Sequence, residues 1–103
     1  MFSKYKSGQV YNVVDAEEHF SFIKGNNIVL FHKPGEGNKV FSVYGTRRIC
    51  DMPVKFYADF TREQLDDFLV LKKTKRLKLN FKTKDGEDFM KSMSPRVLDE
   101  MLN

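Results

Sequence analysis

The alternation of apolar and polar residues predicts four strands in the first 60 residues of the chain. Residues 28–33 and 39–44 are rich in β-branched and aromatic side chains, and residues 34–38 between them contain the Pro and Gly of a hairpin loop. In residues 52–60, apolar side chains at the even positions 52–58 alternate with Lys55, Tyr57 and Asp59, which indicates a strand with one buried face. Residues 10–14 predict a shorter strand.

The segment after the first of these strands predicts a short helix. Asp15 is a good N-cap, and Glu18 follows three residues later, as in a capping box. Apolar residues recur at helical spacing from Ala16 to Ile23. We expect this helix to end at Gly25, because glycine readily adopts the left-handed conformation that closes helices.

Two further helices are predicted by their N-terminal caps. Thr61 and Gln64 have the spacing of a capping box, so we expect a helix to begin at Arg62. Its expected buried stripe is Leu65, Phe68 and Leu69. Ser94 is a cap, and Pro95 after it is the favoured first-turn residue of a last helix. The apolar stripe of that helix is Val97, Leu98, Met101 and Leu102.

Residues 76–83 predict a last strand, and the chain is expected to turn back at Asp85 and Gly86. Asp-Gly is a strong signal for a two-residue hairpin turn, since both positions favour positive φ. Folding the chain about this turn gathers five side chains on the outward face of the hairpin, which we call the lysine face. These are Lys78, Asn80, Lys82, Phe89 and Lys91.

Together these elements predict one domain of the α+β class, spanning residues 1–103. The expected architecture is a mostly antiparallel sheet of about five or six strands with two or three short helices on one face. An arrangement with helices on both faces stays open. The length of 103 residues suits a single core, and the 41% hydrophobic content supports a folded domain.

Positive charge is concentrated in one segment. Seven of the 18 Lys and Arg residues fall within residues 72–84, which contain no acid, and the rest of the chain has eleven basic against 14 acidic residues. Cations beside an exposed aromatic ring suit nucleic acid, because lysines neutralise phosphates and a ring can stack on a base. The predicted nucleic-acid-binding residues are Lys72, Lys73, Lys75, Arg76, Lys78, Asn80, Lys82, Lys84, Phe89 and Lys91.

The same lysines have a second interpretation, in which they keep an outer strand soluble and protect it from edge-to-edge aggregation. A weaker partner-binding surface is predicted elsewhere. Arg47 and Arg48, which follow a turn expected at Gly45, suit a carboxylate or phosphate, although paired surface arginines are also common without a partner. The other candidates for this surface are Glu36, Asp66 and Asp67.

The sequence does not indicate catalytic chemistry. His19 and His32 lack the neighbours typical of a metal or nucleophile site, and we expect both to be structural. Cys50 is expected to be a free, packed cysteine. The acidic residues lie where helix N-termini favour negative charge. We therefore predict no catalytic residues, no metal, no cofactor and no small-molecule substrate.

Cysteine usage and hydropathy predict a cytoplasmic protein. One cysteine rules out an internal disulfide, which suits a reducing compartment. The longest apolar runs are a few residues long, whereas a membrane span needs roughly 20. We expect no membrane association, and the oligomeric state stays open.

The composition of the chain, rich in Lys, Phe and Asn, resembles that of the small early accessory proteins of T4-like bacteriophages. The run Lys-Thr-Lys-Asp-Gly-Glu-Asp-Phe at residues 82–89 illustrates this style. The resemblance covers the whole chain as composition and transfers no functional residue. It implies a protein of the host cytoplasm that binds a host factor, often of the nucleic-acid or defence machinery, and alters its activity.

The predicted function is a non-enzymatic binding protein that acts on nucleic acid, or on a host protein engaged with nucleic acid, through the basic surface at residues 72–91. The alternative is a phage-type accessory protein that inhibits or modulates a host enzyme or defence factor by protein–protein contact. Its interface would be the acidic second helix or the hairpin tip at Glu36.

Overall fold

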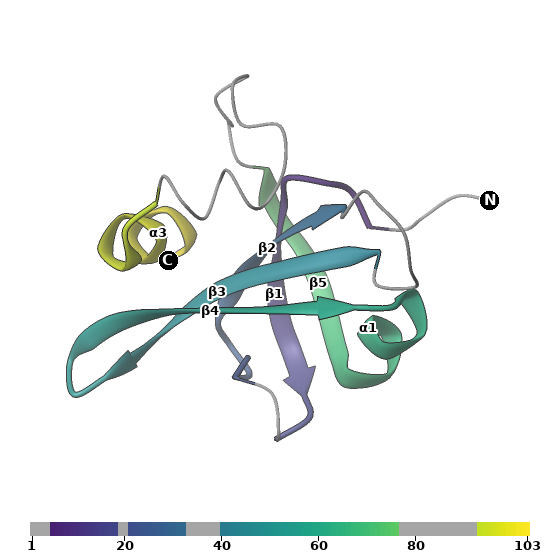
Figure 1. Ribbon diagram of the computed structural model, residues 1–103, viewed down its shortest axis with the longest axis horizontal. Coiled ribbons are helices and arrows are strands. Elements are labelled where there is room, and N and C mark those ends of the chain that lie inside the picture. Colours follow the sequence, from purple (N-terminus) through teal and green to yellow (C-terminus); the bar gives the residue numbers. More distant parts are fainter. Residues whose placement is uncertain (1–4, 19–20, 33–39, 77–92) are drawn as a thin grey trace.

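Five strands and two helices form the part of the chain that the computed structural model describes, namely residues 5–18, 21–32, 40–76 and 93–103. The strands are β1 (Gln9–Ala16), β2 (Asn27–His32), β3 (Phe41–Ile49), β4 (Met52–Phe60) and β5 (Leu69–Arg76). The helices are α1 (Arg62–Phe68) and α3 (Pro95–Leu102). Neighbouring strands pair antiparallel, in the order β4-β3-β2-β1-β5 (Figure 1). The prediction of an α+β fold with a mainly antiparallel sheet is confirmed.

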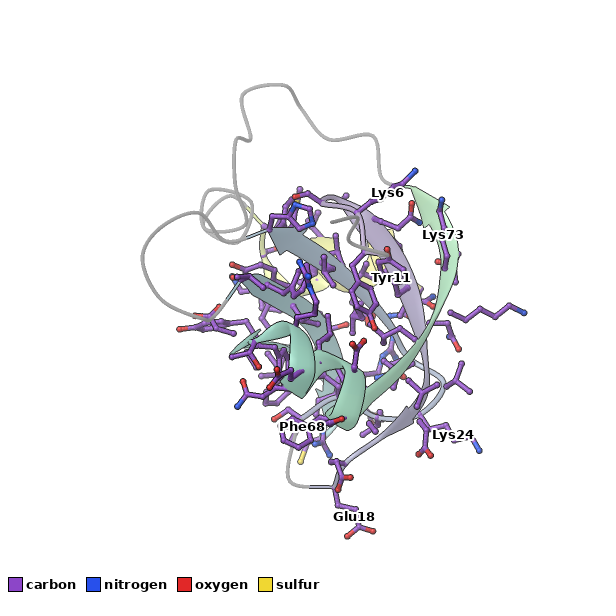
Figure 2. All side chains as sticks on the ribbon, turned by 90° about the vertical axis from the view of Figure 1, so that its right-hand side faces the viewer. Lys6, Tyr11, Glu18, Lys24, Phe68 and Lys73 are labelled. Carbon is purple, nitrogen blue, oxygen red and sulfur yellow. The ribbon has the colours of Figure 1, made fainter. Side chains whose placement is uncertain are left out.

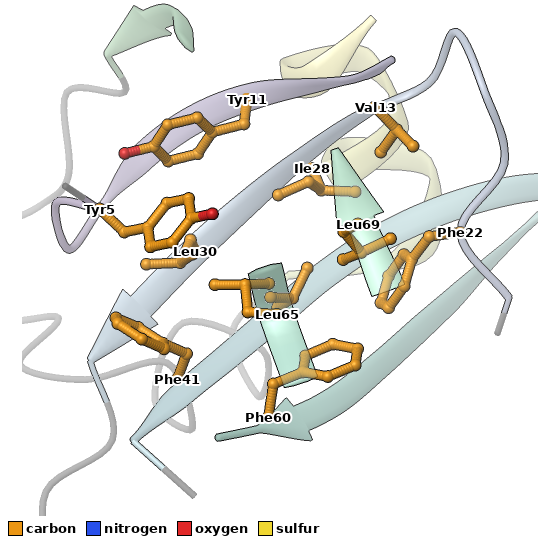
Figure 3. Close-up of a cluster of buried hydrophobic side chains, with 11 residues drawn as sticks. Tyr5, Tyr11, Val13, Phe22, Ile28, Leu30, Phe41, Phe60, Leu65 and Leu69 are labelled. Atoms are coloured by element: carbon orange, nitrogen blue, oxygen red, sulfur yellow. The ribbon is translucent and has the colours of Figure 1, made fainter. Parts of the chain in front are cut away.

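Side chains of the central strands alternate between two hydrophobic cores, one on each face of the sheet. We call the two faces the α1 face and the α3 face, after the helix that covers each. The core on the α1 face, drawn in Figure 3, consists of Tyr5, Tyr11, Val13, Phe22, Ile28, Leu30, Phe41, Val43, Phe60, Leu65 and Leu69. The core on the α3 face consists of Val10, Val29, Phe31, Tyr44, Leu98 and Leu102.

The helices therefore lie on opposite faces of the sheet, and the expectation that they share one face is wrong. The reason is visible in β1 and β2, where consecutive residues are apolar and fully buried, as at Val29 and Leu30. Consecutive strand residues point to opposite faces, so a strand of this kind must be covered on both sides.

The helix expected after β1 is also wrong. Ala16 continues β1 and pairs with Leu69 of β5, and the Asp15 carboxylate accepts a hydrogen bond from the Ala16 N–H at 2.9 Å. Phe22 is buried in the core of the α1 face, with 5% of its surface exposed. Burying this ring and extending the sheet override the local capping signal. Gly25 does have positive φ, of 94°, although it closes a turn before β2.

The second predicted helix is confirmed at its start and wrong at its end. Thr61 caps α1 with its hydroxyl, which accepts from the Gln64 N–H, and the Gln64 side chain accepts from the Thr61 N–H. The helix stops at Phe68, and Leu69 opens β5. The sequence pattern did not predict a strand at residues 69–75. Of the strand predicted at residues 76–83, residues 77–83 lie outside the described part of the chain.

The last helix has the predicted cap and two of the four predicted stripe residues in the core, while Met101 is partly buried and Val97 is 43% exposed. The Ser94 hydroxyl accepts from the Val97 N–H at 3.2 Å, and Pro95 occupies the first turn. Leu98 and Leu102 are fully buried against the sheet.

Gly45 lies in the middle of β3, so the turn expected there is wrong. It pairs with Ile28 of β2 and with Phe56 of β4. A Cβ atom at this position would stand 2.9 Å from Cγ2 of Ile28 and 3.5 Å from the ring of Phe22. Glycine is therefore required here because the Phe22 and Ile28 side chains pack directly against the β3 backbone.

The turn between β3 and β4 lies instead at Cys50 and Asp51. Ile49 pairs with Met52, so these two residues form the whole loop, and both have positive φ, of 52° and 63°. Positive φ at both central residues is the geometry of the hairpin turn that normally selects Asn-Gly. Cys50 is exposed at this tip, so the expectation of a packed cysteine is wrong.

Beyond the reach of β2, residues 46–55 form a two-stranded arm. Gly45 is the last residue of β3 that pairs with β2, whereas pairing with β4 continues to the turn. The arm extends past the rest of the sheet on the left of Figure 1.

Replacing Gly45 by Ala should lower the free energy of unfolding by about 1–3 kcal/mol, because the new methyl group overlaps Ile28 in a filled core. Chemical denaturation measures this loss. Combining Gly45→Ala with Ile28→Ala should cost less than the sum of the two single changes, since the second change removes the overlapping atom. Full stability of Gly45→Ala would contradict the packing described here.

Replacing Cys50 by Asn together with Asp51 by Gly should raise the free energy of unfolding by about 0.5–1 kcal/mol. Both replacements relieve the cost of left-handed backbone at the turn. Cys50→Ser is the matched control and should leave stability nearly unchanged, because it keeps a residue without special tolerance for positive φ. Equal melting curves for the wild type and both variants would show that the turn is not strained.

Candidate binding surface on strand β5

Strand β5 is an edge of the sheet and carries dense positive charge. It pairs with β1 on one side and is the last strand in the sheet order of the described residues. Its sequence, Leu-Val-Leu-Lys-Lys-Thr-Lys-Arg, has four basic residues and no acid. Lys72 and Lys73 are exposed, and as consecutive strand residues they point to opposite faces. Lys75 and Arg76 belong to the same strand.

A network of tyrosines supports the strand at Lys73. Tyr11 of β1 pairs with Lys73, and its hydroxyl accepts from the Lys6 N–H at 3.0 Å. Tyr5 meets Tyr11 edge to face, with ring centroids 5.8 Å apart, and donates its hydroxyl hydrogen to the Asp66 carboxylate at 2.7 Å. The Lys6 backbone and Lys73 thus both adjoin Tyr11, and Figure 2 labels all three residues.

These side chains surround a small hollow between α1 and β5. Its volume is about 300 Å³. Its lining consists of Tyr5, Tyr11, Asp66, Leu69, Val70, Leu71 and Lys73. Because an acidic and a basic residue, Asp66 and Lys73, both line it, this hollow does not select for ligands of one charge.

The opposite end of β5 is acidic. A wider hollow of about 580 Å³ lies where β1 ends and α1 leads into β5. Its lining consists of Asp15, Ala16, Glu17, Glu18, Asp67, Phe68 and Val70. In the described residues, no group of three or more His, Cys, Asp or Glu side chains is arranged to hold a metal ion. The strand therefore runs from an acidic end to a basic end.

All five residues of the predicted lysine face lie outside the described residues. The same holds for Lys84, another predicted nucleic-acid-binding residue. It also holds for His19 and for Glu36, the predicted hairpin-tip contact. The structure therefore describes the beginning of the predicted basic surface, at Lys72 and Lys73.

Arg47 and Arg48 do not extend this surface. Both lie on β3, and the strands β2 and β1 separate them from β5. The Arg47 guanidinium lies 5.7 Å from the centre of the Phe56 ring. Arg48 contacts the Asp99 carboxylate of α3 at 3.4 Å. The two arginines thus belong to the arm.

Asp99 is a residue that the sequence pattern did not single out, and it joins α3 to the base of the arm. Its carboxylate accepts hydrogen bonds from the Thr46 hydroxyl at 2.8 Å, from Arg48 at 3.4 Å and from the Asn103 side chain at 3.3 Å. The hydrogen bond from Thr46 is the largest cause that holds the pKa of Asp99 below its ordinary 3.8, and burial opposes it. Lys55 adds a second link by donating to the Met93 carbonyl at 2.8 Å.

His32 makes contacts that hold the N-terminal segment to the sheet. Its ring Nε2 lies 3.0 Å from the Tyr5 carbonyl oxygen, and its backbone N–H donates to the Ser7 hydroxyl. The imidazole ring packs 5.4 Å from the ring of Phe41. These contacts give His32 a structural role.

Known proteins offer no assignment for this arrangement. No protein-family model, curated protein or solved structure matches the chain. In the described part of the chain, neither helix is long and apolar enough to cross a membrane.

Replacing Asp99 by Ala should lower the free energy of unfolding by about 1–3 kcal/mol at neutral pH, because three donors lose their acceptor. The lowered pKa fixes the pH dependence. The charged carboxylate contributes fully above its ordinary pKa of 3.8, and this contribution is lost as the pH falls through the still lower folded-state value. The difference in free energy of unfolding between wild type and Asp99→Ala should therefore narrow as the pH falls through the folded-state pKa of Asp99.

Denaturation across a pH series checks this expectation. Glu100→Ala is the control, because Glu100 lies on the same helix and only meets Arg96 at 3.9 Å across an exposed surface. A constant gap down to the lowest pH would show that the charge of Asp99 does not hold α3 in place.

Proposed function

We propose that this chain is a non-enzymatic binding protein that acts on nucleic acid, or on a protein engaged with nucleic acid, through a basic surface that begins on β5. The observation that carries the proposal is the exposed pair Lys72 and Lys73 on an edge strand. Half of the eight residues of this strand are basic, and none is acidic.

The spacing of these cations suits a phosphate backbone. A strand rises about 3.3 Å per residue, so the four basic residues from Lys72 to Arg76 span roughly 13 Å. One strand of duplex DNA carries a phosphate for about every 3.4 Å of helix axis, so several phosphates lie within reach. Lys6, whose backbone adjoins Tyr11 as Lys73 does, adds another exposed cation.

The carboxylates at the acidic end of β5 would orient a nucleic acid along the strand. Four carboxylates line the hollow there, from Asp15, Glu17, Glu18 and Asp67. They would repel a polyanion and favour its placement toward Lys72 and Lys73. A charge gradient along one strand orients a partner in addition to attracting it.

A second candidate function is a protein-directed modulator of an enzyme or defence factor. The observation that favours it is the apolar tip of the arm, where Ile49 is 47% exposed and Met52 is 66% exposed. With Arg47 and Phe56 on the same face, the arm has residues that are enriched in protein interfaces. This surface differs from the acidic helix and the hairpin tip at Glu36.

Binding of labelled duplex and single-stranded oligonucleotides, measured by fluorescence anisotropy over a series of salt concentrations, tests the first function. Affinity should fall as salt rises. The double variant Lys72→Ala/Lys73→Ala should bind more weakly, and on duplex DNA its slope of log affinity against log salt should be shallower by about 1.8, the value for two lost phosphate contacts.

The control variant is Lys24→Ala/Arg96→Ala, which removes two exposed positive charges that do not belong to β5 and should keep the wild-type slope. Failure of wild type to bind either oligonucleotide at low salt would sink the direct nucleic-acid function. Equal weakening in both double variants would mean that net charge, and not the β5 surface, governs binding.

A further inference from the structure

Strand β4 forms the second edge of the sheet, opposite β5. All nine of its residues pair with β3, from Met52 opposite Ile49 to Phe60 opposite Phe41. It is the terminal strand in the order of the described sheet. An edge of this length presents a row of backbone N–H and C=O groups that can pair with another strand.

Three side chains on β4 share the α3 face at alternate positions. Tyr57 lies opposite Tyr44, and the two rings stack with centroids 5.8 Å apart at 27°. Lys55, two residues before it, reaches the Met93 carbonyl beside α3. Asp59, two residues after it, accepts from the Ser42 hydroxyl of β3 at 2.7 Å.

The order of charge along this face is self-complementary. An antiparallel strand of the same sequence, centred on Tyr57, places Lys55 opposite Asp59 of the second copy and Asp59 opposite Lys55 of the second copy. Tyr57 then lies opposite its own equivalent at the centre. Cross-strand pairs of opposite charge and of aromatic rings each stabilise antiparallel sheets.

We propose that two copies of this chain associate through β4, antiparallel about a twofold axis at Tyr57, to form one continuous sheet. A twofold interface uses the same surface of both subunits, so it requires this kind of self-complementarity. The partner at this surface is thus a second copy of the chain.

The exposure of Tyr57 supports this pairing. Two thirds of its surface is accessible, 66%, which is large for an aromatic side chain, and the stack on Tyr44 holds the ring against the sheet. In the proposed dimer, the outer edge of the Tyr57 ring meets the Tyr57 ring of the second copy.

On the α1 face of β4, the side chains that meet in this register are apolar. Phe56 lies opposite Ala58 of the second copy, and Val54 lies opposite Phe60 of the second copy. Phe56, Val54 and Ala58 are each half-buried in one chain, so pairing covers apolar surface that a single chain leaves partly open. Pro53 precedes the paired residues and does not interrupt them.

Comparison of the two edges shows why β4 is the edge that suits a second copy. An isolated edge lysine usually guards against pairing, but in the β4 register Lys55 is matched by a carboxylate. Strand β5 has no acid among its eight residues, so antiparallel pairing of two β5 strands would set lysine against lysine. Association through β4 leaves both β5 edges accessible.

Sedimentation equilibrium of the full chain tests the proposal. Wild type should have a concentration-dependent mass that approaches twice 12.1 kDa. Lys55→Asp or Asp59→Lys alone sets like charges opposite each other at two symmetric positions, and each should raise the dissociation constant about tenfold. The charge-swapped double variant Lys55→Asp/Asp59→Lys should restore association.

A cross-linking measurement keeps the test valid if a charge variant folds poorly. In a Cys50→Ser background, Tyr57→Cys should form a disulfide-linked dimer on oxidation, because directly opposite Cβ atoms lie about 4.5–5.5 Å apart. Lys55→Cys is the control and should not cross-link, since the two copies of this position are offset by four residues, roughly 13 Å.

Several outcomes would overturn the proposal. These are a monomeric wild type at all concentrations, charge variants that associate as wild type does, or stronger cross-linking by Lys55→Cys than by Tyr57→Cys. Loss of association in Met52→Lys, with both charge variants unaffected, would show that copies meet at the arm tip instead. The Lys72→Ala/Lys73→Ala variant should keep the wild-type mass, so failure here and failure of nucleic-acid binding are separate results.

Discussion

Both faces of the central parts of β1, β2 and β3 are buried, and the rest of the molecule follows from this constraint. Alternate side chains enter two cores, and two short helices, one on each face, cover them. Each helix is locked by specific polar contacts: the reciprocal cap of Thr61 and Gln64 on α1, and the Asp99 carboxylate on α3. Since helices cover both faces, the described residues leave the two sheet edges and the arm as surfaces for partners.

The two edges differ in charge, and charge determines what each can bind. Lys72 and Lys73 belong to an edge strand without acids, which suits an anionic partner. Lys55 and Asp59 flank Tyr57 on the other edge, in an order that suits a second copy. The two proposed interfaces thus use the same backbone geometry, because edge strands share hydrogen-bonding groups and differ in their side chains.

Local signals predicted the elements whose side chains act on their own backbone. The caps at Thr61 and Ser94, the strand at residues 52–60 and the hairpin of β2 and β3 all depend on near neighbours in the sequence. The errors arose where distant contacts prevailed. Phe22 enters the core and Ala16 pairs with Leu69, so the capping pattern at Asp15 does not produce a helix.

The sequence alone determined the α+β class, most strand positions and the presence of a basic segment on an otherwise acidic chain, because these follow from period and composition. Only the tertiary structure decided that Lys72 and Lys73 lie on an edge while Arg47 and Arg48 lie three strands away. It also decided that Gly45 is a packing position, because Phe22 and Ile28 reach it from other segments. Strand order and face assignment depend on contacts between residues far apart in the chain, which no local pattern encodes.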